Sequence, residues 1–187
     1  MSPRLLLAGF VLALLVAPHL VSEFHVTLLN YIGLYSIVAV GLVLLTGVGG
    51  LMSFGQAAFV GLGGYATAYL TTATNLPSWL AAFGGSPWMG LLAGILLTAA
   101  VSLLLGLLTL RLSGHYLPLG TIAWSISLYF LFGNLEFLGG HTGIAGIPAL
   151  ELFGLPMKDS RYFYYLIWVV VLFAAWLSIN LLDSRGG

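Results

Sequence analysis

Apolar residues run in long stretches along this chain of 187 residues, and short polar segments separate them. Each stretch has about the length of a membrane-crossing helix, which needs roughly 20 residues to span a hydrocarbon core. We therefore predict an all-α, polytopic membrane helical bundle with roughly six spans. The expected spans are residues 5–21, 26–45, 54–70, 88–110, 116–132 and 162–182.

The first apolar stretch has two interpretations. Residues 1–4 are short and basic and residues 5–21 are apolar, which is also the arrangement of a cleaved signal peptide. No small-x-small cleavage site follows, because Ala17 precedes a proline and His19 and Leu20 are bulky. We therefore expect the stretch to be retained as a first span.

Glycine is concentrated in residues 46–70, TGVGGLMSFGQAAFVGLGGYATAYL. A glycine costs roughly 1 kcal/mol relative to alanine inside an exposed helix, so this density needs a structural cause. In membranes small residues let helix backbones approach closely. A broken backbone is tolerated there only where it is buried in protein or lines a cavity. The sequence therefore predicts a broken segment leading into a closely packed helix, with these roles assigned to Gly47, Gly50, Gly55, Gly61 and Gly64.

Polar side chains near this break are the candidates for a substrate path. Ser53 and Gln56 stand where a helix restarts, and a helix N-terminus carries about half a positive charge, which suits a carboxylate. Capping of that helix is an equally good role for Ser53. Thr121 and Ser125 are four residues apart and share a helix face. Hydrogen bonds to another helix are the favoured role of these two hydroxyls, and lining the path is the alternative.

Composition excludes several classes of protein. The chain is 60% hydrophobic and 5% charged, whereas a soluble domain carries about 25% charged residues. Five basic and five acidic side chains leave no net charge, so nucleic acid is not an expected partner. The absence of cysteine excludes disulfides, thiol catalysis and thiolate metal sites. No metal and no cofactor are expected.

The few charged residues indicate an orientation. With six crossings, Arg4, Arg111 and Arg185 share one side of the membrane, and Lys158 and Arg161 share the other. The positive-inside rule then places both chain ends in the cytoplasm. The loop of residues 133–161 would face outward.

Three stretches carry recognisable motifs. They are LLTGVGGLMSFGQAAFVGLGGYATAY at 44–69, LRLSGHYLPLGTIA at 110–123 and GGHTGIAGIP at 139–148. The first resembles the Gly-rich turn and helix of branched-chain amino acid ABC transporter permeases, and the other two resemble a turn and a loop of that family. The motifs occur in the family's order over most of the chain, and their arrangement resembles the LivM type.

The resemblance implies a multi-pass permease subunit of the bacterial inner membrane. It would belong to an ATP-driven importer for branched-chain amino acids, or for related amino acids and amides. The implied partners are ABC ATPase subunits, a sister permease subunit, an external substrate-binding protein and the lipid bilayer. Because ATP would be hydrolysed on the partner subunits, this chain is not expected to be an enzyme. Residues 1–187 would form a single transmembrane permease domain, the N-terminal portion of a longer permease.

Two further sets of residues receive expected roles. Arg111 and Arg185 are the candidates for contacts on the ATPase side, as the resemblance implies. The Gly-rich loop could form a nest of backbone N–H groups for an anion. A tight outer loop, where a binding protein docks, is the favoured alternative, and its residues are Gly140, Thr142, Gly143, Gly146 and Pro148.

Two other classes of protein fit parts of the sequence. An intramembrane serine protease needs a serine near a Gly turn and a histidine on another span, and Ser53 and His115 meet this loosely. A passive small-solute channel is the better alternative, because Gly-interrupted half-helices also build channels. Dependence on ATP separates the importer from the channel.

Overall fold

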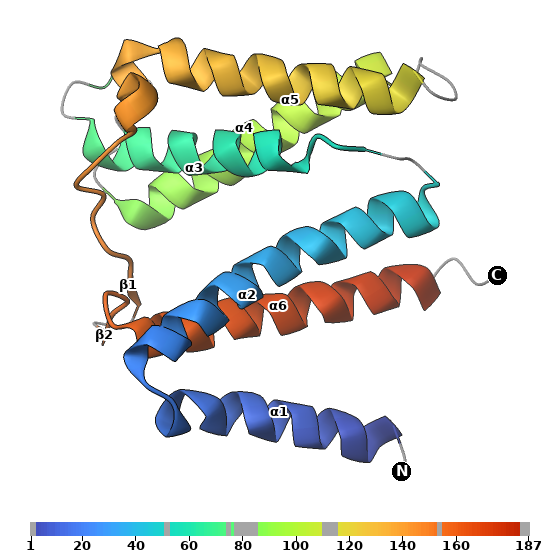
Figure 1. The fold of residues 1–187 in the computed structure, drawn as a ribbon, viewed down its shortest axis with the longest axis vertical. Coiled ribbons are helices and arrows are strands. Elements are labelled where there is room, and N and C mark those ends of the chain that lie inside the picture. Colours follow the sequence, from blue (N-terminus) through green and yellow to red (C-terminus); the bar gives the residue numbers. More distant parts are fainter. Residues whose placement is uncertain are drawn as a thin grey trace. The chain divides into compact units, whose positions relative to one another are not determined.

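The computed structural model describes residues 3–50, 53–73, 76, 86–109, 116–152 and 155–183, and helices dominate these ranges (Figure 1). The α-helices are α1 (Pro3–Leu20), α2 (Glu23–Val43), α3 (Gln56–Thr72), α4 (Pro87–Thr109), α5 (Tyr116–Asn134) and α6 (Ser160–Asp183). The shorter elements are a π-helix at Leu44–Val48, 3-10 turns at Glu136–Leu138 and Gly140–Thr142, and the antiparallel two-residue strands β1 (Glu151–Leu152) and β2 (Leu155–Pro156). The predicted all-α class is confirmed.

The chain divides into two compact units, and each is described by itself. The first unit comprises Met1–Leu44 and Glu151–Gly187, and the second comprises Leu45–Leu150. Helices α1, α2 and α6 therefore belong to the first unit, and α3, α4 and α5 belong to the second. The assignment of the whole chain to a single permease domain stays a prediction.

The expected number of spans needs correction. Within the described residues, four segments are long and apolar enough to cross a membrane: Glu23–Val48, Pro87–Thr109, Tyr116–Asn134 and Ser160–Asp183. Helix α3 has 17 residues, and at 1.5 Å per residue it reaches about 25 Å, less than the hydrocarbon thickness of about 30 Å. The described apolar part of α1, Leu5–Leu20, is also short. The described residues therefore support about four spans by length and composition, and not six.

Local chemistry sets where two of the helices begin. Helix α4 begins at Pro87, whose fixed φ and missing N–H suit the first turn of a helix. Helix α6 begins one residue after Asp159. The carboxylate of Asp159 accepts a hydrogen bond from the backbone N–H of Arg161 at 2.9 Å, as an N-cap residue does.

In the first unit, α2 packs against α6 at a glycine (Figure 1). A Cβ built on Gly33 would lie 2.5 Å from Cγ2 of Ile167, so no larger residue fits without a shift. One turn earlier on α2, the buried Asn30 donates from Nδ2 to the carbonyl of Ser160 at 3.0 Å. The glycine and the asparagine together hold α2 against the start of α6.

Helix α1 contains Pro18, and α6 compensates for the hydrogen bond that this proline removes. Proline has no N–H, so the carbonyl of Leu14, four residues earlier, has no donor within the helix. The hydroxyl of Tyr164, whose side chain is fully buried, donates to that carbonyl at 2.9 Å. The neighbouring Tyr165 donates to the carbonyl of Leu15 at 3.0 Å. Two adjacent tyrosines thus attach α6 to the proline-containing turn of α1.

Replacing Tyr164 by phenylalanine is expected to destabilise the protein by about 1 kcal/mol, because the Leu14 carbonyl would lose its donor. The measurement is reversible unfolding in detergent. Tyr162→Phe is the matched control, because Tyr162 lies on the same helix but is 43% exposed. Equal effects of the two substitutions would show that the Tyr164 hydroxyl does not hold α1.

In the second unit, α3 and α4 pack antiparallel through glycine and threonine residues that face each other (Figure 1). A Cβ built on Gly94 would collide with Oγ1 of Thr67 and lie 2.9 Å from the carbonyl oxygen of Gly63. One built on Gly90 would lie 2.7 Å from Cγ2 of Thr71. One built on Gly63 would lie 3.1 Å from Oγ1 of Thr98. The close contacts recur every four residues on both helices, which is the spacing of one helix face.

Two glycines expected to allow close packing behave differently. Gly61 faces α5, because a Cβ there would lie 3.2 Å from the ring of the buried Phe132. Gly64 is exposed, and no described residue lies within 4 Å of a Cβ built on it. The close packing expected at Gly64 is therefore found at its neighbour Gly63, which faces α4. Consecutive residues point about 100° apart on a helix, so only one of the two can face α4.

Candidate functional site

The predicted break in the Gly-rich segment is present. Helix α2 runs into the π-helix Leu44–Val48, which contains Gly47, and Gly50 then takes a left-handed φ of 63°. Glycine adopts this φ without steric cost. Residues 53–55 are not helical, and α3 begins at Gln56 with Gly55 as its N-cap residue. Backbone groups along this stretch therefore need partners outside a helix.

Two hydroxyls on α5 supply those partners for one residue of the break. The backbone N–H of Phe54 donates to Oγ1 of Thr121 at 3.1 Å. The hydroxyl of Ser125 donates to the backbone carbonyl of Phe54 at 3.0 Å. Thr121 in turn donates to the carbonyl of Pro118 at 2.9 Å. The two α5 residues thus bind the N–H and the carbonyl of a single non-helical residue, and we call this arrangement the Phe54 clamp.

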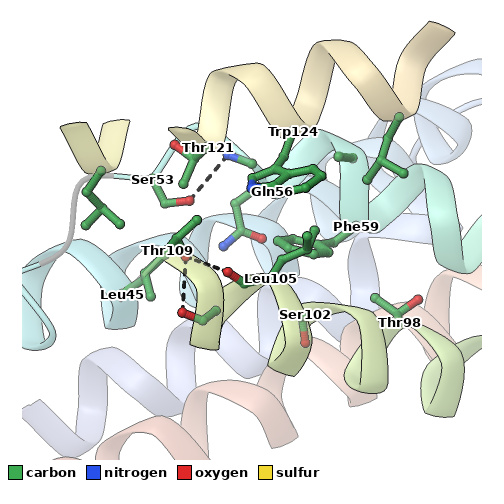
Figure 2. Close-up of a pocket in the computed structure, with 15 residues that line it drawn as sticks. Leu45, Ser53, Gln56, Phe59, Thr98, Ser102, Leu105, Thr109, Thr121 and Trp124 are labelled. Atoms are coloured by element: carbon green, nitrogen blue, oxygen red, sulfur yellow. Dashed lines mark hydrogen bonds between the residues drawn. The ribbon is translucent and has the colours of Figure 1, made fainter. Parts of the chain in front are cut away.

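A cavity of about 500 Å³ lies beside the break, between α3, α4 and α5 (Figure 2). We call it the α3–α5 pocket. Its polar lining consists of Ser53, Gln56, Thr98, Ser102, Thr109 and Thr121. Its larger apolar lining residues are Leu45, Phe59, Leu105, Leu117, Trp124 and Leu128. Small-molecule sites commonly have this size and this predominance of apolar side chains with a few polar groups.

The pocket brings together most of the residues expected on a substrate path. Ser53, Gln56 and Thr121 line it, whereas Ser125 does not and serves the Phe54 clamp. Ser53 is not the N-cap residue of α3, but its Oγ accepts from the N–H of the N-cap residue Gly55 at 3.3 Å. Its hydroxyl therefore supports the helix start and also faces the pocket (Figure 2).

The polar groups of the pocket differ in whether their hydrogen-bonding capacity is already used. Ser102 donates to the carbonyl of Ala99 at 2.9 Å, and Thr109 donates to the carbonyl of Leu105 at 2.7 Å. The hydrogen-bond donors of these two hydroxyls are therefore already used by carbonyls of their own helix. By contrast, Oγ1 of Thr98 is buried and has no hydrogen-bond partner among the described residues. The side-chain amide of Gln56 forms no hydrogen bond with the described part of the chain and points into the cavity (Figure 2).

Sequence reasoning missed the contribution of α4. The Leu-rich run at 88–110 shows no polar face, and its hydroxyl residues do not stand out. Thr98 and Ser102 are four residues apart and lie on the face that turns toward the pocket, and Leu105 and Thr109 continue that face. Hydroxyl residues at this spacing in an otherwise aliphatic helix are the signal that could have identified the face.

The Gly-rich loop after α5 is a tight turn. Gly139, Gly140, Gly143 and Gly146 have φ values between 54° and 78°. The N–H of Gly140 donates to the carbonyl of Leu135 at 3.2 Å, and the N–H of Gly143 donates to that of Gly140 at 3.3 Å. These donors are used inside the loop, which favours the tight loop over an anion nest. The hydroxyl of Thr142 donates a hydrogen bond to the carbonyl of Gly139 at 2.7 Å and so closes the turn. Pro148 lies in the exposed stretch that follows.

The remaining candidate residues are not placed by the structure. Arg111, Arg185 and His115 lie outside the described residues. The proposed contacts on the ATPase side and the partner histidine of a serine protease therefore stay predictions. In the described part of the chain, no three histidine, aspartate or glutamate side chains come together as metal ligands.

The long apolar helices define a polytopic membrane protein. The sequence matches the family described as branched-chain amino acid transport system / permease component over residues 24–184. The chain belongs to this family and is a multi-pass protein of the inner membrane.

Two curated relatives belong to the same family. The high-affinity branched-chain amino acid transport system permease protein LivM of Salmonella typhimurium is 35% identical over 156 residues, and that of Escherichia coli is 36% identical over 156 residues. The match covers 81% of this chain and 35% of each relative. The chain therefore spans about a third of the length of these relatives. No solved structure matches the chain significantly.

Proposed function

We propose that this chain is part of the permease of an ATP-driven importer for branched-chain amino acids, or for related amino acids and amides. The α3–α5 pocket would form a segment of its substrate path. The observation that supports this most directly is the cavity beside the broken helix, into which Gln56 projects an amide that forms no hydrogen bond with the described residues (Figure 2). Broken helices in transporters provide such sites because their freed backbone and polar side chains can bind a solute.

The lining of the pocket suits a small amphipathic solute. Phe59, Leu105 and Trp124 offer apolar surface for an aliphatic side chain. Burying such a side chain contributes about 1.5–3 kcal/mol. Ser53 and Gln56 offer polar groups for the amino-acid head group. Binding of this modest strength favours flux, because a solute that enters the pocket can also leave it.

The proposed partners follow from the family. ABC ATPase subunits would hydrolyse ATP, a sister permease subunit would complete the path, and an external substrate-binding protein would deliver the solute. The tight loop around Gly140 and Gly143 is the proposed docking surface for the binding protein. Arg111 and Arg185 are the proposed residues on the ATPase side. The chain itself would catalyse no reaction.

Alternating access requires an element with two arrangements. The break between the π-helix and α3 is that element in our proposal, because Gly50 has a left-handed φ and residues 53–55 are not helical. The Phe54 clamp would connect its position to α5. Movement of α5 relative to the break would then change access to the pocket.

Uptake measurements test this proposal. The complete complex is reconstituted in vesicles with radiolabelled leucine, and uptake is compared with and without ATP and with and without the ATPase subunits. We expect leucine uptake only when ATP and the ATPases are both present. Leucine flux that persists without the ATPases would instead establish the passive channel, and the importer proposal would be rejected.

A further inference from the structure

The α3–α5 pocket contains no ionisable side chain among the described residues that line it. Its polar groups are hydroxyls and one amide, and the walls around them are apolar. A solute with a net charge that enters such a site leaves water without meeting an opposite charge on the described lining, which is strongly unfavourable. A zwitterion carries both charges close together and has no net charge, so its desolvation is less unfavourable when polar groups meet each end.

Gln56 is the pocket residue best suited to meet both ends of a zwitterion. Its side-chain amide offers two N–H donors and one carbonyl acceptor, and none of them is used within the described chain. The donors can bind a carboxylate and the carbonyl can accept from an ammonium group. The other hydroxyls are less available, since Ser102 and Thr109 already donate to their own helix and Thr121 belongs to the Phe54 clamp.

The apolar residues place the rest of the solute. Phe59 lies one turn after Gln56 on α3, and Trp124 lies across the pocket on α5 (Figure 2). An amino acid whose head group is bound at Gln56 would direct its side chain between these rings. A cationic or anionic side chain in that place would have no counter-charge within the described lining.

We propose that Gln56 sets the charge selectivity of this pocket, so that it accepts amino acids without net charge and rejects cationic and anionic ones. This inference rests on the proposed function, because it assumes that the pocket holds the transported solute. It assigns to this chain a selectivity that acts in addition to that of any external binding protein.

The test measures equilibrium binding of radiolabelled leucine, lysine and glutamate to the purified complex of the full chain and its membrane and ATPase partners, without the external binding protein. In the unmodified complex we expect leucine to bind at least tenfold more tightly than lysine or glutamate. Gln56→Glu should increase the lysine-to-leucine affinity ratio at least tenfold, because the negative charge added to the pocket offsets the net positive charge of lysine. Gln56→Leu should weaken leucine binding about tenfold without favouring lysine.

Ala57→Glu is the matched control for the added charge. Ala57 is adjacent on the same first turn of α3, but it is exposed and does not line the pocket. The control should leave the lysine-to-leucine ratio unchanged. The inference would be overturned by equal binding of leucine and lysine to the unmodified complex, or by an unchanged ratio in Gln56→Glu. If Gln56→Glu does not fold, unchanged leucine binding in Gln56→Leu would overturn it as well.

A different result would reject the proposed function itself. If the unmodified complex showed no ATP-dependent uptake of leucine in vesicles, the importer proposal would fail, whatever the binding ratios. ATP-dependent leucine uptake with no effect of Gln56 on the ratio would leave the importer intact and reject only the role of Gln56.

Discussion

Replacing Gly94 by alanine is expected to destabilise the protein by about 2 kcal/mol, within the range found for overpacked cores. The added methyl group would collide with Oγ1 of Thr67 and lie 2.9 Å from the carbonyl oxygen of Gly63. Neither group can move easily. The Thr67 hydroxyl is held by its own bond to the Gly63 carbonyl at 2.9 Å, and that carbonyl is part of the α3 backbone. Helices α3 and α4 would have to separate.

Gly106→Ala provides the matched control on the same helix. In the part of the chain that the structure describes, nothing lies within 4 Å of a Cβ built on Gly106. Alanine favours a helix over glycine by up to about 1 kcal/mol, so this variant should be neutral or slightly more stable. The free energy of unfolding in detergent is measured for both variants. We expect it to fall in Gly94→Ala and to stay the same or rise slightly in Gly106→Ala. Equal and small effects would show that α3 and α4 do not pack through Gly94.

Removing the Phe54 clamp is expected to reduce leucine uptake at least tenfold. In Thr121→Val the N–H of Phe54 loses its acceptor, and in Ser125→Ala the carbonyl of Phe54 loses its donor. Each unsatisfied backbone group costs about 1–3 kcal/mol when water is excluded, and lipid supplies no replacement partner. The double variant should therefore lose about 2 kcal/mol of stability around the break. A double-mutant cycle on uptake and unfolding is the measurement.

Ser127→Ala is the control for this experiment. Ser127 lies on the same helix, is exposed and does not line the pocket. It should behave like the unmodified protein in both assays. Because the two hydroxyls bind the same residue, we expect the single substitutions to be coupled. Normal uptake in the double variant would show that the break is held by other contacts and that the clamp has no part in transport.

Several features of the fold could be predicted from single stretches of sequence. The six helices lie close to the six apolar runs, because a run of that length satisfies its backbone only as a helix in lipid. The break around Gly50 was also predictable, since the density of glycine there is incompatible with a regular helix. The family motifs are equally local. These properties depend on neighbouring residues alone.

The number of spans was overestimated because the apolar runs at 5–21 and 54–70 have only 17 residues each, fewer than the roughly 20 that a crossing needs. The run at 54–70 includes Phe54, but α3 begins only at Gln56. The backbone of Phe54 is bound by α5 instead of continuing the helix. The start of α3 is therefore set by a contact with a segment more than 60 residues away, which the apolar run alone does not reveal.

In the candidate site, too, some features follow from the local sequence and others only from tertiary packing. The sequence alone determined that Ser53 and Gln56 stand at a helix start beside a Gly-rich break, because capping and glycine preferences act over a few residues. Tertiary packing decided that Gly63 and not Gly64 meets α4, and that Thr98 on α4 faces the same cavity as Gln56. An apolar helix is equally compatible with lipid on every side. Its rotation is therefore set by the helices against which it packs, and only the folded structure shows which face lines the pocket.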